Sequence, residues 1–543
     1  MRQFNLTLAA LATTTGLVAA QSKAAIEKQL QANGLNIALL NSTINGPLAT
    51  TDCSLLCSTI NLFYPNRILT QNEAAFTNWT ESFWSQQQEV VTPRCVFEPT
   101  SAVEVSSALL LAELFSCPFA VKSGGHAAFG GSSNIENGLS ISLGGLDEIV
   151  LSDDQSVVSI GSGNIWVDIY DYLEEYSLAV IGGRVSTIGV GGLTTGGIFI
   201  ANVETSAPGG ISFFSQEYGW ACDNVVNYEV VLASGIVVDV NIDSYPDLYW
   251  ALRGGGNNFG IVTRFELSTI QQGFLWSGSL IYLSEYTTDA IDAFYNYGLN
   301  AASDPKSAVI MNWAYDEGMF LAVADLEYAN TTVNPPIFQN FTVIPTVENT
   351  MANRTLSEVT DMFQESNPDG LRESYWTATF RLSKDMIAFL VDTFEEEAIR
   401  AANATGYIPA LVLQIISTDM TTQMQKNGGN ALGLSPVDGN LILLNLSFMW
   451  DDIADDNLIL DILGTITNKS IAYAKENCLY KEYLYMNYAS QYQAVLPSYG
   501  TENFNKLKDV SAKYDPFQVF QKLQPGYFKL SSQPPNTTYP TYD

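Results

Sequence analysis

The stretch Val121-Lys122-Ser123-Gly124-Gly125-His126, continued by Ala127-Ala128-Phe129-Gly130-Gly131, follows directly on apolar residues that begin at Pro118. The apolar run predicts a short strand, and the paired glycines after it let the backbone approach a ligand closely or adopt a positive φ. His126 is the only histidine among the 543 residues of the chain. By residue type alone, such a histidine is more often a packed polar residue than a chemical group, so both interpretations stay open at this point.

Two more glycine-rich segments follow along the chain. The first is Gly182-Gly183-Arg184-Val185-Ser186-Thr187-Ile188-Gly189-Val190-Gly191-Gly192, and the second is Arg253-Gly254-Gly255-Gly256-Asn257-Asn258-Phe259-Gly260-Ile261-Val262. The first has too many glycines for a helix or an ordinary strand, so it is either a loop that contacts a ligand or a merely flexible one. Neither segment shows G-x-G-x-x-G at a strand-to-helix junction, so a Rossmann site is not supported. Backbone amides in glycine loops can nonetheless hold a pyrophosphate.

The hydrophobic pattern around these segments predicts mixed helices and strands. The expected helices are residues 24–40, an exposed leader, and residues 103–115 and 165–176; the expected strands include residues 139–143, 156–160, 411–416 and 441–446. Residues 225–232 and 236–240 are apolar runs separated by Ala233-Ser234-Gly235, which predicts a β-hairpin.

A C-terminal set of signals completes the pattern, with Tyr485-Met486-Asn487-Tyr488-Ala489 and, further on, Lys513-Tyr514-Asp515-Pro516. Together with the loop at His126 and the later glycine segments, these residues resemble flavoproteins of the vanillyl-alcohol oxidase and p-cresol methylhydroxylase superfamily. Within it, the chain looks most like the secreted fungal berberine-bridge-enzyme-like oxidases. The resemblance covers most of the chain, and its two separated motif sets occur in the family's order.

The resemblance implies a covalently bound FAD, because the family's histidine that matches His126 is bonded to the flavin 8α-methyl carbon. The cofactor-binding residues that it implies are His126, Ser123, Gly124, Gly125, Gly189, Gly192, Gly260, Ile261, Val262 and Asn487. Tyr485 is the candidate catalytic base, since in the family this segment returns beside the isoalloxazine ring. No metal is expected, because a single histidine cannot complete a usual zinc set.

The implied fold is α+β, with a two-part FAD-binding domain of the p-cresol methylhydroxylase type and an α/β substrate domain built on an antiparallel sheet. A C-terminal segment is expected to return to the FAD-binding domain. The length of 543 residues also favours two domains. The expected divisions are a signal peptide (1–20), an N-terminal segment (21–92), the FAD-binding domain (93–272), the substrate domain (273–478), the C-terminal segment (479–530) and a tail (531–543).

The chain departs from the family pattern at two places. Bicovalent members carry a cysteine that binds the flavin C6 position and is followed by Pro-Thr. At the matching position this chain has Val185-Ser186-Thr187. A second covalent bond is therefore impossible, and we expect a single bond through His126. Residues 198–209 form an insertion before Gly210-Ile211-Ser212-Phe213-Phe214, and it is either a loop over the active site or an error of the gene model.

Composition limits the partners of the protein. The formal net charge is −33, from 24 basic and 57 acidic residues, and such a field repels nucleic acid and anionic membranes. Residues 1–20 are typical of a secretory signal, with Arg2, an apolar run over 6–18 that is too short to span a bilayer, and a small-residue cleavage site at Ala19-Ala20. We therefore expect a secreted protein whose partners are a small-molecule substrate and dioxygen; the sequence indicates no oligomeric state.

Glycosylation and disulfides fit secretion. Asn-X-Ser/Thr sequons occur at Asn41, Asn78, Asn330, Asn340, Asn353, Asn403, Asn445, Asn468 and Asn536. The six cysteines contain no C-x-x-C pair, and disulfides are their default state in an oxidising compartment. The resemblance suggests that Cys57 (or Cys53) pairs with Cys95, with the remaining thiols buried.

These observations predict a secreted FAD-dependent oxidase that removes a hydride from a C–H bond beside an alcohol or amine, or in a ring being closed. Dioxygen would reoxidise the flavin and give hydrogen peroxide. Small secondary metabolites and oligosaccharides are the competing substrates, and the missing cysteine at Val185 favours the metabolites. A non-catalytic secreted glycoprotein with a flavin fold is the alternative from another class, against which the intact His126 loop argues.

Overall fold

The computed structural model describes residues 21–43, 52–196, 210–316, 318–532 and 534–535. The expected signal peptide (1–20), the insertion (198–209) and the sequon at Asn536 lie outside the described residues.

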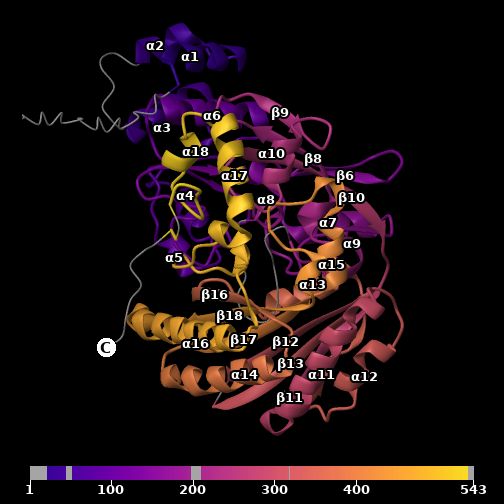
Figure 1. Cartoon of the computed structure of the whole chain (residues 1–543). Coiled ribbons are helices and arrows are strands. Elements are labelled where there is room, and N and C mark those ends of the chain that lie inside the picture. The colour runs from indigo at the N-terminus through magenta and orange to yellow at the C-terminus, as the bar shows by residue number, and fades with distance from the viewer. Residues whose placement is uncertain (1–20, 44–51, 197–209, 317, 533, 536–543) are drawn as a thin grey trace, which may run out of the picture.

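Two small sheets form the upper part of the molecule in Figure 1. The first has four strands in the order β1 (Ile68–Leu69), β2 (Cys95–Phe97), β4 (Leu139–Ser142) and β3 (Phe119–Lys122), and β2, β4 and β3 run parallel. The second is antiparallel, in the order β5 (Ile149–Leu151), β6 (Val157–Gly161), β10 (Ile261–Gln271), β8 (Val225–Val231) and β9 (Val237–Val240), with β7 (Leu178–Val180) also pairing β10. The loop Ser123-Gly124-Gly125 follows β3 of the first sheet directly, and Gly260 directly precedes β10 of the second.

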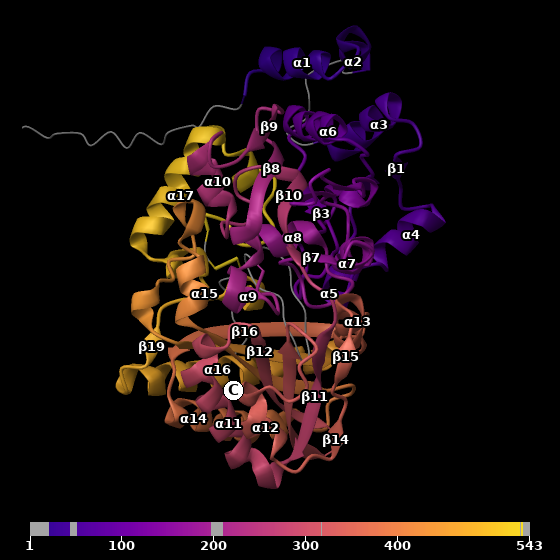
Figure 2. The same cartoon turned by 90° about the vertical axis from the view of Figure 1, so that its right-hand side faces the viewer.

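A nine-stranded antiparallel sheet forms the lower part (Figures 1 and 2). Its main path is β14 (Glu348–Asn349), β11 (Leu275–Leu283), β13 (Met319–Tyr328), β12 (Ser307–Asp316), β17 (Ile408–Ile416), β18 (Leu441–Trp450), β16 (Arg372–Arg381) and β19 (Tyr480–Lys481), with β15 (Ala352–Arg354) pairing β11. Because strand side chains alternate between faces, one face is apolar and packs on helices, while the other turns towards the two smaller sheets.

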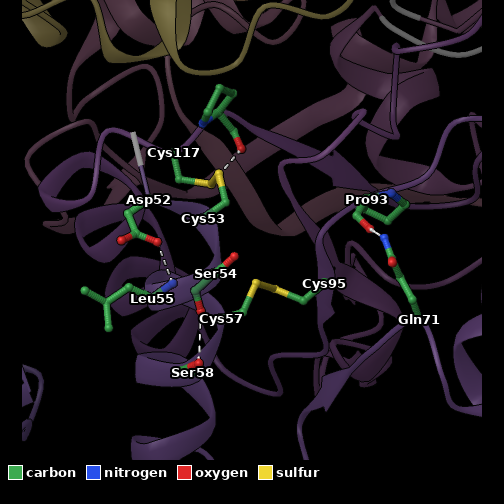
Figure 3. Close-up of a disulfide and its surroundings, with 11 residues drawn as sticks. Asp52, Cys53, Ser54, Leu55, Cys57, Ser58, Gln71, Pro93, Cys95 and Cys117 are labelled. Carbon is green, nitrogen blue, oxygen red and sulfur yellow. Dashed lines mark hydrogen bonds between the residues drawn. A yellow bond between two sulfur atoms is a disulfide. The ribbon is translucent and has the colours of Figure 1, made fainter. Parts of the chain in front are cut away.

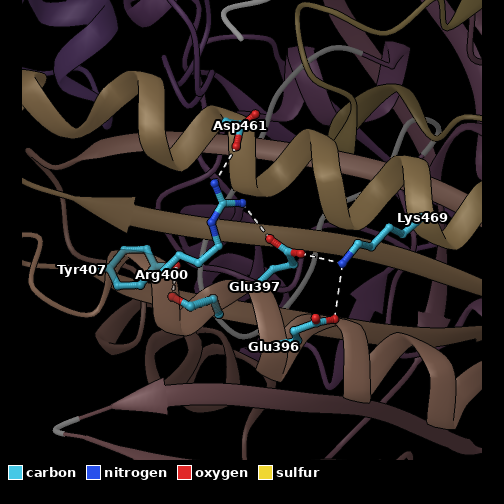
Figure 4. A network of polar contacts seen from close by, with 7 residues as sticks. Glu396, Glu397, Arg400, Tyr407, Asp461 and Lys469 are labelled. Carbon is cyan, nitrogen blue, oxygen red and sulfur yellow. Dashed lines mark hydrogen bonds and ion pairs between the residues drawn. The ribbon is translucent and has the colours of Figure 1, made fainter. Parts of the chain in front are cut away.

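The helices on the apolar face are α11 (Thr287–Asn300), α14 (Lys384–Ala398) and α16 (Asp456–Glu476). An ion-pair network joins the region at the end of α14 to α16 (Figure 4). In it Arg400 contacts Glu397 at 2.7 Å and Asp461 at 2.8 Å, and Lys469 contacts Glu397 at 2.6 Å. Its carboxylates are all paired with cations, so this network holds helices together and is not a reactive cluster.

The C-terminal segment returns to the upper part, as the resemblance implies. Helix α17 (Thr501–Tyr514) lies against α10 (Pro246–Leu252), where Lys513 forms an ion pair of 2.6 Å with Asp247. Beyond it, α18 (Val519–Lys522) leads to Leu523, whose carbonyl accepts a hydrogen bond of 2.6 Å from the Phe119 amide on β3. The end of the chain is thus fixed to the strand that carries the His126 loop.

Two disulfides hold the N-terminal segment to the first sheet (Figure 3). Cys57–Cys95 joins α3 (Cys53–Phe63) to β2, which confirms one of the two expected pairings. Cys53–Cys117 was not expected, and the expectation that the remaining thiols are buried is wrong for Cys478, which is exposed. Cys53 and Cys57 lie one helical turn apart on the same face of α3, and for this reason one can pair with Cys95 in β2 and the other with Cys117, two residues before β3.

Most of the expected elements are present, with one clear error. Helices α6 (Ala102–Leu114) and α7 (Trp166–Glu174) and the β8–β9 hairpin confirm the hydrophobic pattern. The leader is not one helix over 24–40 but two, α1 (Lys23–Ala32) and α2 (Ile37–Thr43). Gly34 lies between them with φ of +93°, a conformation that ends helices.

Within the described ranges, no helix combines the length and apolar character that a bilayer crossing requires. The same residues contain no group of three or more His, Cys, Asp or Glu side chains suited to a metal ion.

Candidate active site

The first two glycine segments contact each other through their backbones. A Cβ atom at Gly124 would lie 2.4 Å from the amide nitrogen of Gly189, and one at Gly189 would lie 2.2 Å from that of Gly124. Ser123 fixes the crossing, because its hydroxyl donates to the Ser162 carbonyl at 2.6 Å and accepts from the Gly191 amide at 3.2 Å. Only glycine fits at these two positions, so the loop after residue 182 is a built structure and not merely flexible.

A cavity lies beside this crossing. Its lining includes half of the ten residues expected to bind the cofactor: Ser123, Gly192, Gly260, Ile261 and Val262. Gly124 and Gly189 form the crossing, and Gly125 lies against Lys122 and Phe83. These three glycines, His126 and Asn487 are not among the lining residues. The lining also includes Asn257 and Gln524, which were not expected. The cavity thus offers glycine backbone, hydroxyls and amides, which suit an anionic nucleotide.

His126 lies at the junction with the large sheet and is 3% exposed. Its ring stacks on Trp84 at 5.3 Å between centroids, and Trp84 in turn stacks on Tyr375 of β16 at 6.0 Å. The His126 Nε2 atom is 2.8 Å from the Thr187 hydroxyl, which donates its proton to Gln364. Since a hydroxyl has one proton to give, Nε2 carries the hydrogen of this contact, and in the neutral imidazole the lone pair lies on Nδ1.

A buried polar chain connects the glycine loop with the large sheet. Arg184, 2% exposed, donates to the side-chain oxygen of Gln414 at 2.8 Å, and the Gln414 amide donates to the Tyr488 hydroxyl at 2.7 Å. Tyr485 lies beside this chain, with its ring 4.7 Å from that of Tyr488. Burial raises the pKa of Tyr485 well above 10, and the Tyr488 and Tyr483 phenols act in the same direction, while Arg184 lowers it.

Two acidic residues that sequence reasoning missed lie on β13, on the face of the sheet that carries Gln414. Asp325 stands opposite Ile310, which stands opposite Gln414 on the next strand, and Glu327 is two residues further along β13. Glu327 is 1% exposed, and neither of its carboxylate oxygens has a hydrogen-bond partner among the described residues. Burial raises its pKa to about 8, although Arg184 acts in the opposite direction.

Asp325 is better satisfied than Glu327, because it accepts hydrogen bonds from Ser279 and, at 2.8 Å, from Asn312. Burial and the neighbouring Glu327 still raise its pKa well above the ordinary value. The sequence signal for both was Ala324-Asp325-Leu326-Glu327, in which acids alternate with apolar residues over a strand.

The glycine crossing, the cavity beside it and the buried histidine together fit a flavin-binding enzyme. The FAD binding domain family matches residues 93–241. The chain is 36% identical over 462 residues to the FAD-dependent monooxygenase tpcD of Cochliobolus heterostrophus, covering 83% of this chain and 87% of that protein. It therefore belongs to the berberine-bridge-enzyme-like FAD oxidoreductases.

Solved structures show the same fold. BBE-like 1 of Physcomitrella patens is similar with a TM-score of 0.69 at 16% identity, over 89% of this chain and 99% of that one. The xylooligosaccharide oxidase of Myceliophthora thermophila C1 is similar with a TM-score of 0.67 at 16% identity, over 87% of this chain and 99% of that one. The protein is thus an FAD-dependent oxidoreductase, and the cavity and the crossed glycine loops fit the nucleotide that it binds.

Proposed function

We propose that FAD is held by one covalent bond, from the Nδ1 atom of His126. The observation that carries this proposal is the hydrogen-bond relay from His126 through Thr187 to Gln364, since it assigns the lone pair to Nδ1. Val185 offers no second nucleophile. When bound, FAD accepts a hydride from the substrate. The remaining work, which is to orient the substrate and to take its proton, falls to side chains of the chain.

Tyr485 and Glu327 are the two candidates for the proton acceptor. A phenol whose pKa is raised by burial is a poor base at neutral pH, so Tyr485 can serve only if substrate or cofactor binding stabilises its phenolate. Glu327 has a pKa near the range that suits a general base, and its two oxygens have no partner among the described residues. We therefore propose Glu327 as the base and keep Tyr485 as the alternative.

Anaerobic flavin reduction by a substrate found in a screen tests this choice. Loss of a general base costs about 10²–10⁴-fold in rate, so Glu327→Gln should slow reduction by that order while the FAD content stays unchanged. Tyr485→Phe should have a much smaller effect, and Glu348→Gln, at an exposed position of the same sheet, none. A slow Tyr485→Phe enzyme beside a fast Glu327→Gln enzyme would reverse the assignment.

We further propose an oxidase reaction, in which dioxygen takes up the electrons and leaves as hydrogen peroxide. The relative tpcD bears the name of a monooxygenase, which is the specific reason to measure both outcomes. One equivalent of peroxide for each substrate oxidised supports the oxidase. Incorporation of isotopically labelled dioxygen into the product, without peroxide, supports a monooxygenase and would contradict the proposal.

The proposed substrate is a small secondary metabolite. The single possible flavin bond supports this class, because bicovalent relatives are typically the ones that oxidise sugars. The xylooligosaccharide oxidase shares only the fold with this chain, so oligosaccharides stay the alternative. A peroxide-release screen that contains both classes decides between them, and activity confined to oligosaccharides would refute the proposal.

Secretion is also part of the proposal, with mature protein beginning near Gln21. Six of the expected glycosylation sites are exposed in the described structure: Asn41, Asn78, Asn340, Asn353, Asn403 and Asn468. Asn445 instead lies in β18 and is 2% exposed, so it cannot accept a glycan in the folded protein. Peptide mapping of protein from the culture medium should find glycans at exposed sites and never at Asn445.

A further inference from the structure

A second cavity, of about 140 Å³, lies between the start of β16, the loop after His126 and residues 489–492. It shares no lining residue with the cavity beside the glycine crossing. Its volume is close to the roughly 150 Å³ of an engineered apolar protein cavity that binds benzene, so it has room for a small ring. It is therefore a separate place at which a ligand can bind.

Glu373 is the unusual residue in its wall. Its side chain is 1% exposed, and neither carboxylate oxygen has a hydrogen-bond partner among the described residues. The fold uses only its backbone, which donates to the Gln87 side-chain oxygen at 3.1 Å and accepts from the Gln87 amide at 2.8 Å. Burial of an unsatisfied carboxyl group destabilises a protein, and burial together with Asp369 raises the pKa of Glu373 well above its ordinary value.

The other charges in the wall cancel. Arg372 forms a two-point ion pair with Asp456, with Nε 2.5 Å from Oδ1, and Trp450 donates to the same carboxylate at 2.8 Å. Among the described lining residues, the one charge left unbalanced is that of an ionised Glu373. An anion would meet two carboxylates here, and a metal ion would find too few ligands, whereas a single positive charge would complete the site.

Two aromatic rings lie on the Glu373 side of the cavity: Tyr375, on the same face of β16, and Phe129, from the loop after His126; Trp450 and Tyr492 line its other side, on the opposite face of the sheet. Aromatic faces attract ammonium groups, and an ammonium N–H would give the Glu373 oxygens the donors that they lack. We propose that this cavity binds a small organic amine in its protonated form, with the ammonium group against Glu373 and its carbon skeleton against Tyr375 and Phe129.

The position of the site gives it a connection to the cofactor loop. Ala128, two residues after His126, forms part of its wall, and Tyr375 stacks on Trp84, which stacks on His126. The site therefore lies behind the histidine, on the side of the large sheet. Occupancy of this cavity does not depend on the base, the substrate or the covalent bond proposed above.

Titration calorimetry on the FAD-loaded protein under anaerobic conditions tests the proposal, with benzylamine as the charged probe and benzyl alcohol as its neutral counterpart. Benzylamine should bind saturably to the wild type. Glu373→Gln keeps the backbone bonds to Gln87 and the shape of the side chain, and it should weaken benzylamine by at least about tenfold. Glu348→Gln, on exposed strand β14, should bind like the wild type.

Three results would overturn the proposal. These are a wild type that shows no saturable benzylamine binding, a Glu373→Gln protein that binds it as tightly as the wild type, and a wild type that binds benzyl alcohol equally well. The last comparison uses only the wild type, so the proposal stays testable even if Glu373→Gln does not fold.

Discussion

Thr187 determines what His126 can do, because one hydroxyl serves two neighbours. It gives its proton to Gln364 and accepts the one on Nε2, so the imidazole is held in a single tautomer with a nucleophilic Nδ1. Replacement of His126 by Ala should therefore release FAD into the supernatant of acid-precipitated protein, whereas the wild-type protein should retain it. Absorbance of the two fractions measures this, and free FAD from the wild type would contradict the covalent bond.

Val185 gives a second prediction at the scale of single residues. It is fully buried in the largest apolar cluster, and the family resemblance implies that it stands where bicovalent members carry cysteine. Mass spectrometry of a tryptic digest should accordingly find flavin only on the peptide that contains His126. Val185→Cys should add a second flavopeptide, and Ile188→Cys, equally buried on the same loop, should not. Flavin on a second peptide of the wild type would refute the single bond.

Individual site residues could be predicted from the sequence only where they belong to a recognisable motif. Gly124 and Gly189 were singled out through the family resemblance, because the second glycine run by itself left a ligand-contacting and a flexible loop equally open, and their crossing was not predicted. Glu327 and Glu373 were missed, because each is one acid in a strand and only the tertiary packing shows that it is buried without a partner among the described residues. Pattern reasoning shows which face a residue occupies, but it does not show what covers that face.

At the scale of elements, the two disulfides make a prediction about stability. They close loops of 64 and 38 residues, and the loss of such a bond typically costs about 2–5 kcal/mol. Cys117→Ser should lower the free energy of unfolding in denaturant by this amount, slightly more than Cys57→Ser, because its loop is longer. Cys478→Ser removes an exposed thiol that forms no disulfide and should change nothing. Equal stability of all three variants would contradict the prediction.

The accuracy of the element predictions follows the strength of the local signal. The β8–β9 hairpin and α7 were predictable because alternation and amphipathic spacing are local properties. The break at Gly34 was missed, because a single glycine within a polar helical pattern is often tolerated. The order of the nine strands was beyond prediction, since it depends on contacts between residues far apart in the chain.

For the whole molecule, buried acids and surface charge together predict how stability depends on pH. Burial raises the pKa of Glu113 to about 7 and that of Glu327 to about 8, against an unfolded value of about 4.3. At a pH between the unfolded-state and folded-state pKa values, these two glutamates are protonated in the folded protein and ionised in the unfolded chain. The stability that they contribute is thus fully present below about pH 4 and is lost as the pH rises through 7 and 8.

The surface acts in the same direction, because a net charge of −33 repels itself more strongly as further acids ionise. Carboxyl groups with a lowered pKa, such as Asp247 beside Lys513, have the opposite sign, but they titrate below this window. The midpoint temperature of thermal unfolding should therefore decrease between about pH 5 and about pH 8. Each fully buried acid should lower the free energy of unfolding by up to about 1.4 kcal/mol per pH unit in this range.

Glu327→Gln separates the contribution of the buried acids from that of the surface charge, since it removes one buried carboxyl group that titrates and leaves the surface charge almost unchanged. The variant should show a shallower dependence of its unfolding midpoint on pH than the wild type, and Glu348→Gln, at an exposed position, should keep the wild-type slope. Identical slopes for all three proteins would mean that Glu327 is not protonated in the folded state at neutral pH. In that case its carboxylate must be stabilised by Arg184, and the proton acceptor would be ionised without help from the substrate.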